Sequence, residues 1–232
     1  MGARRARGTV LGTRRGMTRR KLPALLDAHR DALSACRRCA LDDDRVRPIL
    51  SDARHPRAML VGQAPGKSEI EDRRAFTGRA GRTLFRWLER AGLDEATFRR
   101  EVYIAAVTRC YPGPSPSGRG DRVPSPEEQA RCAPWLDAEL DLIQPSLIIP
   151  VGRLAIDRFL AREPLDRLVG RCHVARVRGR SVQVIPLPHP SGASSWVNIP
   201  ANRALLDAAL DHLAAALAEP GVTGLRPARR TA

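Results

Sequence analysis

The chain has 232 residues, a hydrophobic share of 43% and a formal net charge of +15. This size fits one α/β domain with a core of its own, and no apolar run approaches the roughly 20 residues that a membrane-spanning helix needs. The start of the chain lacks the apolar stretch of a secretory signal. We therefore expect a soluble, cytoplasmic protein without a membrane partner.

The positive charge is concentrated at the two ends of the chain. Residues 1–22 hold seven arginines and one lysine without an acid, and the tail from Gly221 adds three arginines. A basic arm suits nonspecific contact with nucleic-acid phosphates. Arginine outnumbers lysine 38 to 2, so codon bias explains the charge equally well, and Met17 is an alternative start. We expect a disordered basic arm over residues 1–22 and a basic tail over residues 219–232.

Apolar periodicity predicts strands that alternate with helices. Leucines at helical spacing predict a first helix over residues 22–35. The remaining elements are strands expected at 58–61, 102–107, 147–152, 173–177 and 181–185, and helices expected at 82–91, 126–143, 153–160 and 200–216. Ser125, Pro126 and Glu128 form the start signal of the helix at 126. Residues 66–81 and 112–124 read as loops.

This alternation is typical of a doubly wound, mostly parallel sheet. We expect a single α/β domain over residues 23–218, with a four-stranded, mostly parallel central sheet flanked by helices.

Two turns in this fold carry the functional signal. Val61-Gly62-Gln63-Ala64-Pro65-Gly66 and Pro188-His189-Pro190-Ser191-Gly192 each follow an apolar run of strand character. Loops that leave the carboxyl ends of parallel strands converge on one rim of the sheet, where ligands bind. The two turns are therefore predicted to form the two halves of one pocket.

Four cysteines frame the first turn, at Cys36, Cys39, Cys110 and Cys132. Four thiolates can complete either a tetrahedral zinc site or a [4Fe-4S] cluster. Their spacing matches no compact zinc finger, and disulfides are disfavoured without a secretion signal. From the residues alone, a cluster, a zinc ion and unligated thiols all stay open.

Together the two turns and the cysteines resemble the uracil-DNA glycosylase superfamily, nearest its iron-sulfur families 4 and 5. The resemblance covers about residues 25–218 and implies a uracil-DNA glycosylase-like fold. It also implies that Cys36, Cys39, Cys110 and Cys132 bind a [4Fe-4S] cluster with a structural role. Cys172 is left over, and we expect it to be a small residue on a buried strand.

The resemblance assigns roles to both turns. The His-Pro-Ser motif of the family stands intact at positions 189–191, which implies that His189 donates a hydrogen bond to O2 of the base while Ser191 contacts the DNA backbone. Gly62, Gln63, Ala64 and Gly66 match the first motif and would line the base site. Phe76 matches the family's stacking aromatic residue. Residues 192–196 occupy the place of the loop that presses into the duplex, with Trp196 either as a wedge or packed against the last helix.

Two positions depart from the best-known family patterns. Ala64 lies where the best-studied family has a catalytic Asp, so a substitute carboxylate must come from the following loop, at Glu69, Glu71 or Asp72. We expect Glu71 first and Asp72 second. Ala106 lies where the uracil-specific cluster families place an Asn that reads the pyrimidine edge, so the base pocket is expected to accept more than uracil.

The resemblance implies a monomeric, monofunctional DNA glycosylase. It would hydrolyse the N-glycosidic bond of uracil, or of a related deaminated base, in the DNA of a prokaryotic nucleoid. The alternative is a noncatalytic or covalent-capture protein that binds uracil-containing DNA, and a weaker one is a zinc-bound nucleic-acid module.

Overall fold

The structure is a computed structural model that describes residues 21–39, 47–117, 120–191, 195–219 and 222. Residues 1–20 of the expected basic arm and most of the tail lie outside these residues, whereas Leu22, the last residue assigned to the arm, begins the first helix. The elements in chain order are α1 (Leu22–Ser34), β1 (Ala58–Gly62), α2 (Lys67–Asp72), α3 (Arg79–Arg90), α4 (Glu95–Glu101), β2 (Val102–Ala106), α5 (Pro126–Ile143), β3 (Leu147–Pro150), α6 (Arg153–Ile156), α7 (Leu165–Leu168), β4 (His173–Val177), β5 (Arg180–Val184), the 3-10 turn η2 (Trp196–Asn198) and α8 (Pro200–Ala218).

The strands form one sheet in the order β2-β1-β3-β5-β4. Neighbours from β2 to β5 are parallel, and β4 joins the edge antiparallel to β5. The sheet thus has five strands and not the expected four. The fifth strand arises because Arg178 (φ 49°) and Gly179 (φ 78°) both adopt left-handed backbone, the geometry of a tight hairpin turn.

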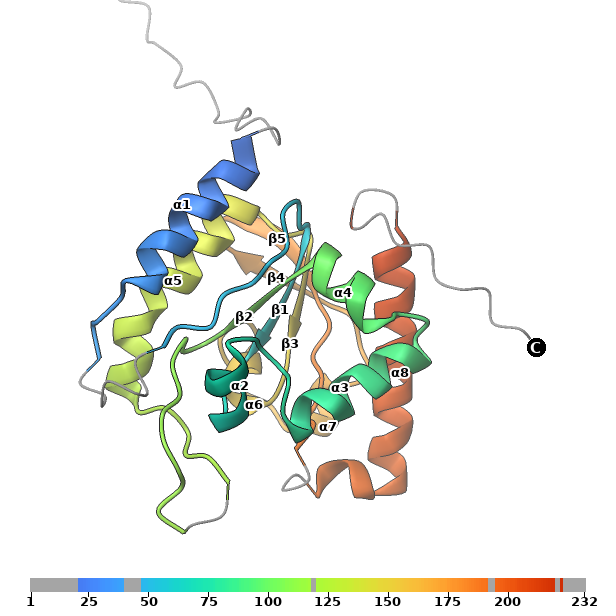
Figure 1. The fold of residues 1–232 in the computed structure, drawn as a ribbon. Coiled ribbons are helices and arrows are strands. Elements are labelled where there is room, and N and C mark those ends of the chain that lie inside the picture. The colour runs from blue at the N-terminus through green and yellow to red at the C-terminus, as the bar shows by residue number, and fades with distance from the viewer. Residues whose placement is uncertain (1–20, 40–46, 118–119, 192–194, 220–221, 223–232) are drawn as a thin grey trace, which may run out of the picture.

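Helices cover both faces of the sheet (Figure 1). One core cluster joins α1 and α5 to the sheet through residues such as Leu26 and Leu136. The other face is covered by α3, α4 and α8, with Leu88, Phe98 and Leu213 in the core. The three-layer, doubly wound α/β architecture is therefore confirmed.

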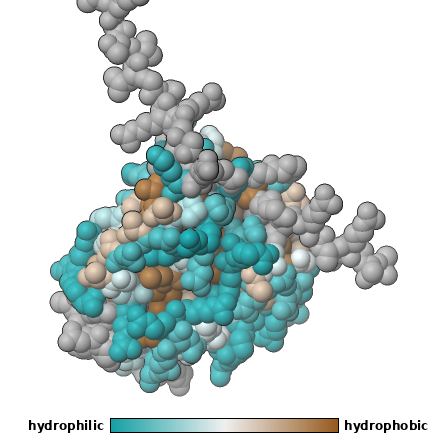
Figure 2. Space-filling view, turned by 45° about the horizontal axis from the view of Figure 1, so that its top comes forward, coloured by the Kyte–Doolittle hydropathy of each residue, from teal (hydrophilic) through white to brown (hydrophobic). Residues whose placement is uncertain are grey.

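Most of the face drawn in Figure 2 is hydrophilic, with small and scattered apolar patches. Among the described residues only Val123, Val174 and Ile199 are large hydrophobic side chains that stand exposed. No helix in the described part of the chain is long and apolar enough to cross a membrane.

Local sequence signals explain most helix boundaries. Ser125 caps α5 as predicted: its Oγ accepts a hydrogen bond from the Glu128 amide at 3.3 Å, and Glu128 Oε2 accepts one from the Ser125 amide at 2.8 Å. Helix α4 was not expected, although the Asp94 side chain caps it by accepting from the Thr97 amide at 2.9 Å. Helix α2 forms inside the segment that reads as a loop.

Cys172 corrects another expectation. It lies just before β4 and is exposed, so it is not a small residue on a buried strand. The strand begins one residue later because His173, not Cys172, pairs with Val184 of β5.

Candidate active site at the carboxyl edge of the sheet

A pocket opens where β1, β3 and β5 end, on the side of the sheet where α2 and the loop after β2 lie in Figure 1. Its volume is about 250 Å³. The residues that line it are Gly62, Gln63, Ala64, Pro65, Gly66, Glu69, Phe76, Ala80, Pro112, Gly120, Asp121, Arg122, Val151, His189 and Ser191. The structure therefore brings the two predicted turns together in one site, as the sheet topology requires.

Hydrogen bonds between the strand ends fix the first turn to the residues that follow β2 and β3. The Val107 and Thr108 amides donate to the carbonyls of Gly62 and Gln63, at 2.9 and 3.1 Å. On the other side of β1, the Val151 amide donates to the Val61 carbonyl at 2.8 Å. The pocket floor is thus an extension of the sheet ladder.

His189 follows β5 in a turn that Ser191 closes. The Ser191 amide donates to His189 Nδ1 at 3.2 Å, and the Ser191 hydroxyl lies 2.9 Å from the same nitrogen. Because Nδ1 accepts a hydrogen bond, the proton of the neutral imidazole is on Nε2. Among the described residues, Nε2 has no protein partner, so its N–H is free for a ligand in the pocket.

Burial lowers the pKa of His189. Removal from water penalises the charged imidazolium, so the neutral donor form is favoured at neutral pH. The ring lies against Gly152, where an added β-carbon would come within 2.9 Å of His189 Cδ2. Gly152 also has a φ of 83°. This position therefore requires glycine for two reasons: its backbone conformation, and the lack of space for a side chain beside His189.

Glu69 is the carboxylate that α2 brings to the pocket. Its Oε2 accepts a hydrogen bond from the Gly66 amide, and its carboxylate also accepts one from the Phe76 amide. Burial raises the pKa of Glu69, and the nearby charges of Asp121 and Asp72 add to this, while the two amide donors oppose it. Glu69 therefore has the perturbed environment that is typical of functional carboxylates.

The two carboxylates that the sequence favoured lie elsewhere. Glu71 and Asp72 are exposed on α2, and neither lines the pocket. Their place is explained by helical geometry, because residues 69 and 71 point about 200° apart around a helix axis.

Asp121, in the segment that reads as a loop and that was not among the predicted site residues, also lines the pocket. A β-carbon added at Gly66 would lie 2.8 Å from Glu69 Oε2 and 3.0 Å from Asp121 Oδ2, so both carboxylates converge there. A short antiparallel bridge between Pro114 and Asp121 folds this loop back on itself and brings Asp121 to the pocket. The pattern of apolar residues in the sequence gives no sign of this bridge, so Asp121 could not be identified from the sequence.

Phe76 lies beside the first turn, as expected for a stacking residue. Its backbone is left-handed, with φ 58°. A β-carbon added at Gly62 would lie 3.0 Å from Phe76 Cζ, so the ring lies directly against the backbone of Gly62. The ring forms part of the pocket wall.

Ala106 is at the end of β2, in register with Gly62. It lines a narrow cavity of about 30 Å³ that also touches Gly62, Ala64, Glu69 and Phe76. This cavity shares its walls with the main pocket, and the methyl group of Ala106 presents no hydrogen-bonding group to it.

The four cysteines line one pocket between the end of α1, the loop after β2 and the start of α5. Burial raises the pKa of Cys110 to about 12, and the neighbouring thiols of Cys132, Cys39 and Cys36 add to this effect. Burial also raises the pKa of Cys132 and Cys39. Any metal or cluster bound here must therefore displace the thiol protons.

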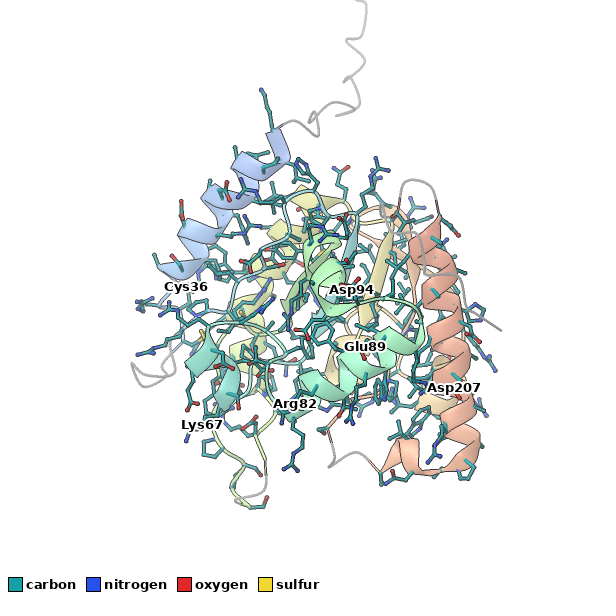
Figure 3. The ribbon with its side chains drawn as sticks, turned by 45° about the vertical axis from the view of Figure 1, so that its right-hand side comes forward. Cys36, Lys67, Arg82, Glu89, Asp94 and Asp207 are labelled. Carbon is teal, nitrogen blue, oxygen red and sulfur yellow. The ribbon has the colours of Figure 1, made fainter. Side chains whose placement is uncertain are left out.

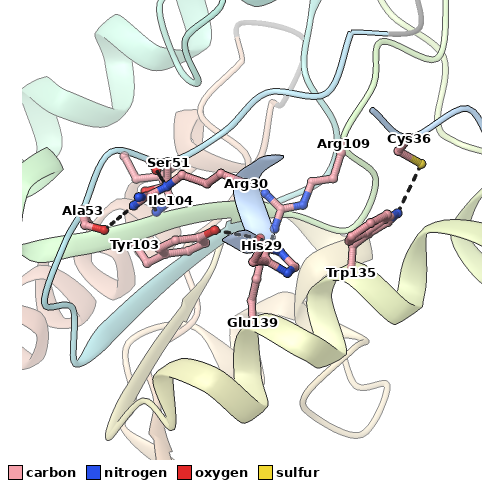
Figure 4. Close-up of polar contacts among 10 residues, drawn as sticks. All are labelled: His29, Arg30, Cys36, Ser51, Ala53, Tyr103, Ile104, Arg109, Trp135 and Glu139. Atoms are coloured by element: carbon pink, nitrogen blue, oxygen red, sulfur yellow. Dashed lines mark hydrogen bonds and ion pairs between the residues drawn. The ribbon is translucent and has the colours of Figure 1, made fainter. Parts of the chain in front are cut away.

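Three of the four sulfur atoms have an N–H donor. Trp135 Nε1 donates to Cys36 Sγ at 3.2 Å (Figure 4), the Arg109 amide donates to Cys132, and the Arg47 amide donates to Cys110. Within the described ranges, no three His, Cys, Asp or Glu side chains are placed to hold one metal ion. A four-iron cluster bonds each cysteine to a different iron and is tuned by hydrogen bonds to the sulfurs, so the shared pocket and its N–H donors suit a cluster.

Exposed cations lie on and between α2 and α3, the helices that follow the first turn. Lys67 and Arg82, both labelled in Figure 3, are exposed at the starts of α2 and α3. Arg73, Arg74 and Arg79 are exposed between them.

Trp196 is half-buried against the core, and its carbonyl accepts a hydrogen bond from Asn202 of α8 at 3.0 Å. Of the two alternatives for Trp196, the structure shows the packing one. Residues 192–194 of the expected insertion loop lie outside the described residues.

The fold and the pocket define an α/β protein with a ligand site at the carboxyl ends of its parallel strands. The profile of the "Uracil DNA glycosylase superfamily" matches residues 48–214. The chain is 30% identical to a type-4 uracil-DNA glycosylase of Thermotoga maritima, over 72% of this chain and 82% of that protein. A type-4 uracil-DNA glycosylase of Sulfurisphaera tokodaii is 28% identical over 72% and 75%. A type-5 uracil-DNA glycosylase of Thermus thermophilus is 34% identical over 45% and 50%.

The chain therefore belongs to the uracil DNA glycosylase superfamily. This confirms the resemblance that the two turns and the cysteines indicate.

Proposed function

We propose that this protein is a monofunctional DNA glycosylase that hydrolyses the N-glycosidic bond of uracil and of related deaminated bases in DNA. The observation that carries this proposal is the neutral His189, whose Nε2–H is free in a pocket of a uracil DNA glycosylase superfamily fold. Its relatives bear the name uracil-DNA glycosylase, and its chemistry follows from the site.

The target base must first leave the stack and enter the pocket. Breaking the bond between the base and the sugar leaves negative charge on the base and positive charge on the sugar. His189 Nε2–H donates to the base oxygen on which the negative charge grows. A neutral donor held by Ser191 needs no reorganisation when that charge develops.

Glu69 is the carboxylate that we assign to the sugar side, in place of Glu71 and Asp72. It lines the pocket, whereas those two carboxylates are exposed. Ionised Glu69 stabilises the sugar cation and orients the water that attacks it. Lys67 is exposed and does not line the pocket, so water and not an amine is the proposed nucleophile.

Phe76 stacks on the flipped base. The residues of the first turn form the pocket wall that this base contacts: Gly62, Gln63, Ala64 and Gly66. Base–aromatic stacking holds any base because every base has a π-face. The methyl group of Ala106 supplies no hydrogen bond for the pyrimidine edge, so the pocket accepts more than one deaminated base.

The exposed cations on and between α2 and α3, Lys67, Arg74 and Arg82 among them, bind the DNA phosphates on either side of the flipped nucleotide. Phosphate contacts supply most of the affinity and position the duplex. The Ser191 hydroxyl already contacts His189. We therefore assign Ser191 two roles: it positions His189, and it contacts the DNA backbone. We propose that the protein acts on DNA as a monomer.

The test is single-turnover excision from labelled duplexes that hold one uracil, hypoxanthine or xanthine. The wild type should release the base and leave an alkali-labile site. His189→Ala should lower the rate by about 100-fold to 1,000-fold, the effect typical of one lost donor to a developing anion. It should leave duplex affinity nearly unchanged, because phosphate contacts dominate affinity. Tight binding of uracil-containing DNA without base release, or with a covalent adduct, would instead establish the capture protein.

We further infer that Cys36, Cys39, Cys110 and Cys132 hold a [4Fe-4S] cluster. The shared pocket and the N–H donors to Cys36, Cys110 and Cys132 support this. The cluster would tie the end of α1 and the start of α5 to the loop after β2. Anaerobically purified protein should be brown and hold iron and sulfide, and Cys132→Ser should bleach it while Cys172→Ser should not. Colourless protein with one equivalent of zinc would contradict the inference.

A further inference from the structure

We propose that Arg99 on α4 is a positioning residue that fixes the stacking ring of Phe76. The proposal rests on the proposed function and extends it to a residue outside both turns. Phe76 has a left-handed backbone, which is unfavourable for a residue with a bulky side chain. Such a conformation persists only where its surroundings enforce it, so the structure must hold the peptide groups on both sides of Phe76.

Arg99 holds both peptide groups through their carbonyls. Its Nη1 donates to the Ala75 carbonyl at 2.8 Å and its Nη2 donates to the Phe76 carbonyl at 3.3 Å. The Phe76 amide, on the first of these peptide groups, donates to the Glu69 carboxylate. Phe76 is therefore held at both of its peptide groups by charged side chains.

Arg99 is itself rigidly held. It is 8% exposed, its Nε donates to Glu95 Oε1 at 2.7 Å, and its guanidinium lies 4.5 Å from the centre of the Phe85 ring. A planar guanidinium fork can bridge two successive carbonyls and stack on a ring at once, which a lysine ammonium cannot do.

The restrained peptide sets the position of the Phe76 ring. A β-carbon added at Gly81 would lie 1.9 Å from the Phe76 carbonyl oxygen, and the ring itself lies against Gly62. The backbone thus has no room to relax toward α3, and the ring has none to move toward β1. Arg99 does not line the pocket, so it acts on a flipped base only through Phe76.

The test is a double-mutant cycle on Arg99 and Phe76. The probe is a duplex that holds 2′-fluoro-2′-deoxyuridine, whose glycosidic bond resists cleavage, and the second measurement is the single-turnover rate on deoxyuridine. Arg99→Gln should weaken binding of the probe duplex about ten-fold and slow excision about ten-fold. The expected effect corresponds to losing part of the stacking energy that one base contributes. Arg99→Lys should lie between Arg99→Gln and the wild type. Arg100→Gln, an exposed arginine of the same helix, is the matched control and should change neither.

In a Phe76→Ala background, Arg99→Gln should cause no further loss, because groups that act through one another are not additive. Full additivity of the two changes would overturn the proposal.

A measurement without DNA separates this proposal from the proposed function. Hydrogen exchange of the amides at 75–78 should become faster in Arg99→Gln than in the wild type and in Arg100→Gln, while the β1 amides stay protected. Unchanged exchange at 75–78 in folded Arg99→Gln would overturn the positioning role, whatever the protein does to uracil. Faster exchange there in a protein that excises no base would support the restraint on Phe76 and refute the glycosylase alone.

Discussion

His189 and Glu69 both line the pocket, and burial favours the neutral form of each side chain. It lowers the pKa of the imidazole and raises that of the carboxyl. In the proposed mechanism, this favours the state of His189 that donates to the base. It opposes the ionised state of Glu69 that would stabilise the sugar cation, so the proposed activity should fall as the pH drops through the raised pKa of Glu69.

Glu69→Gln should therefore lower the single-turnover rate by about 100-fold, the lower range for a positioned acid or base group. It should also remove the acidic limb that Glu69 adds to the pH–rate profile. Glu71→Gln is the matched control, since Glu71 is exposed on the same helix, and it should retain the wild-type rate and profile. A full loss in Glu71→Gln with an active Glu69→Gln would restore the assignment that the sequence favoured.

Ala106 is a second residue whose substitution has a defined outcome. Ala106→Asn places an amide in the narrow cavity beside Gly62 and Phe76. Sites that hydrogen-bond a base reject analogues more steeply than apolar walls, so the ratio of uracil to hypoxanthine excision should rise by about ten-fold. Strict uracil specificity in the wild type, unaltered by the Asn, would mean that another residue reads the base.

At the level of the elements, the junction of β3 and α6 sets the place of the His189 imidazole. Gly152 has left-handed backbone, and an added β-carbon would contact the His189 ring. The junction is bonded to the His189 turn by the Gly152 amide, which donates to the Leu187 carbonyl at 2.9 Å. The two loops are therefore joined directly beside the His189 ring.

Gly152→Ala should displace the His189 ring and lower the excision rate at least ten-fold, with duplex affinity nearly unchanged. The control is Gly179→Ala in the β4–β5 turn, where the backbone is also left-handed but an added β-carbon meets nothing within 4 Å. Both variants should lose about 1 kcal/mol of stability from the backbone, measured by thermal unfolding, and only Gly152→Ala should lose activity. Equal rates in the two variants would show that the ring does not depend on this contact.

Sequence patterns predict the elements of this fold well where one physical signal dominates. Buried strands such as β1 and β3 are continuous apolar runs, and Ser125 marks the start of α5 by its cap. Short helices such as α2 and α4 have too few turns for periodicity to show. The site was also predicted only in part. The motif residues His189 and Phe76 lie in the pocket as expected. Which carboxylate enters the pocket, and that Asp121 lies there, depend on how two loops pack together, which the sequence pattern does not show.

On the scale of the whole molecule, a buried polar network joins α1, β2 and α5 (Figure 4). Glu139, fully buried on α5, pairs with Arg109 and accepts a hydrogen bond from Tyr103 Oη at 2.8 Å, and His29 Nε2 of α1 lies 3.1 Å from it. Arg30 ties α1 to the segment before β1 by donating to the Ser51 carbonyl at 2.7 Å. Because His29 is part of this network, we expect the folding stability to depend on pH.

Burial lowers the pKa of His29 from 6.5 to about 4, and the charges of Arg109 and Arg30 add to this. The unfolded chain therefore binds a proton at His29 at a higher pH than the folded protein does. Folding stability should fall as the pH drops from 6.5 toward 4, by about 3 kcal/mol in total at about 1.4 kcal/mol per pKa unit.

His29→Gln, which keeps an N–H donor near Glu139, should flatten the fall in stability between pH 6.5 and 4. Urea unfolding of both proteins across this range measures the difference. Parallel curves for the wild type and the variant would show that His29 is not the responsible group.

The strand order has a consequence for how the protein acquires its activity during synthesis. Strands β2, β1 and β3 lie side by side, but the strand that delivers His189, β5, is the last to leave the ribosome. Because domains emerge from the ribosome from the N-terminus onward, β5 can pair with β3 only after the other parallel strands have emerged. A nascent chain that ends before β5 would hold the cysteines, Glu69 and Phe76 but not His189, so under the proposed function a ribosome-bound fragment could form part of the pocket without being able to cut a base from DNA.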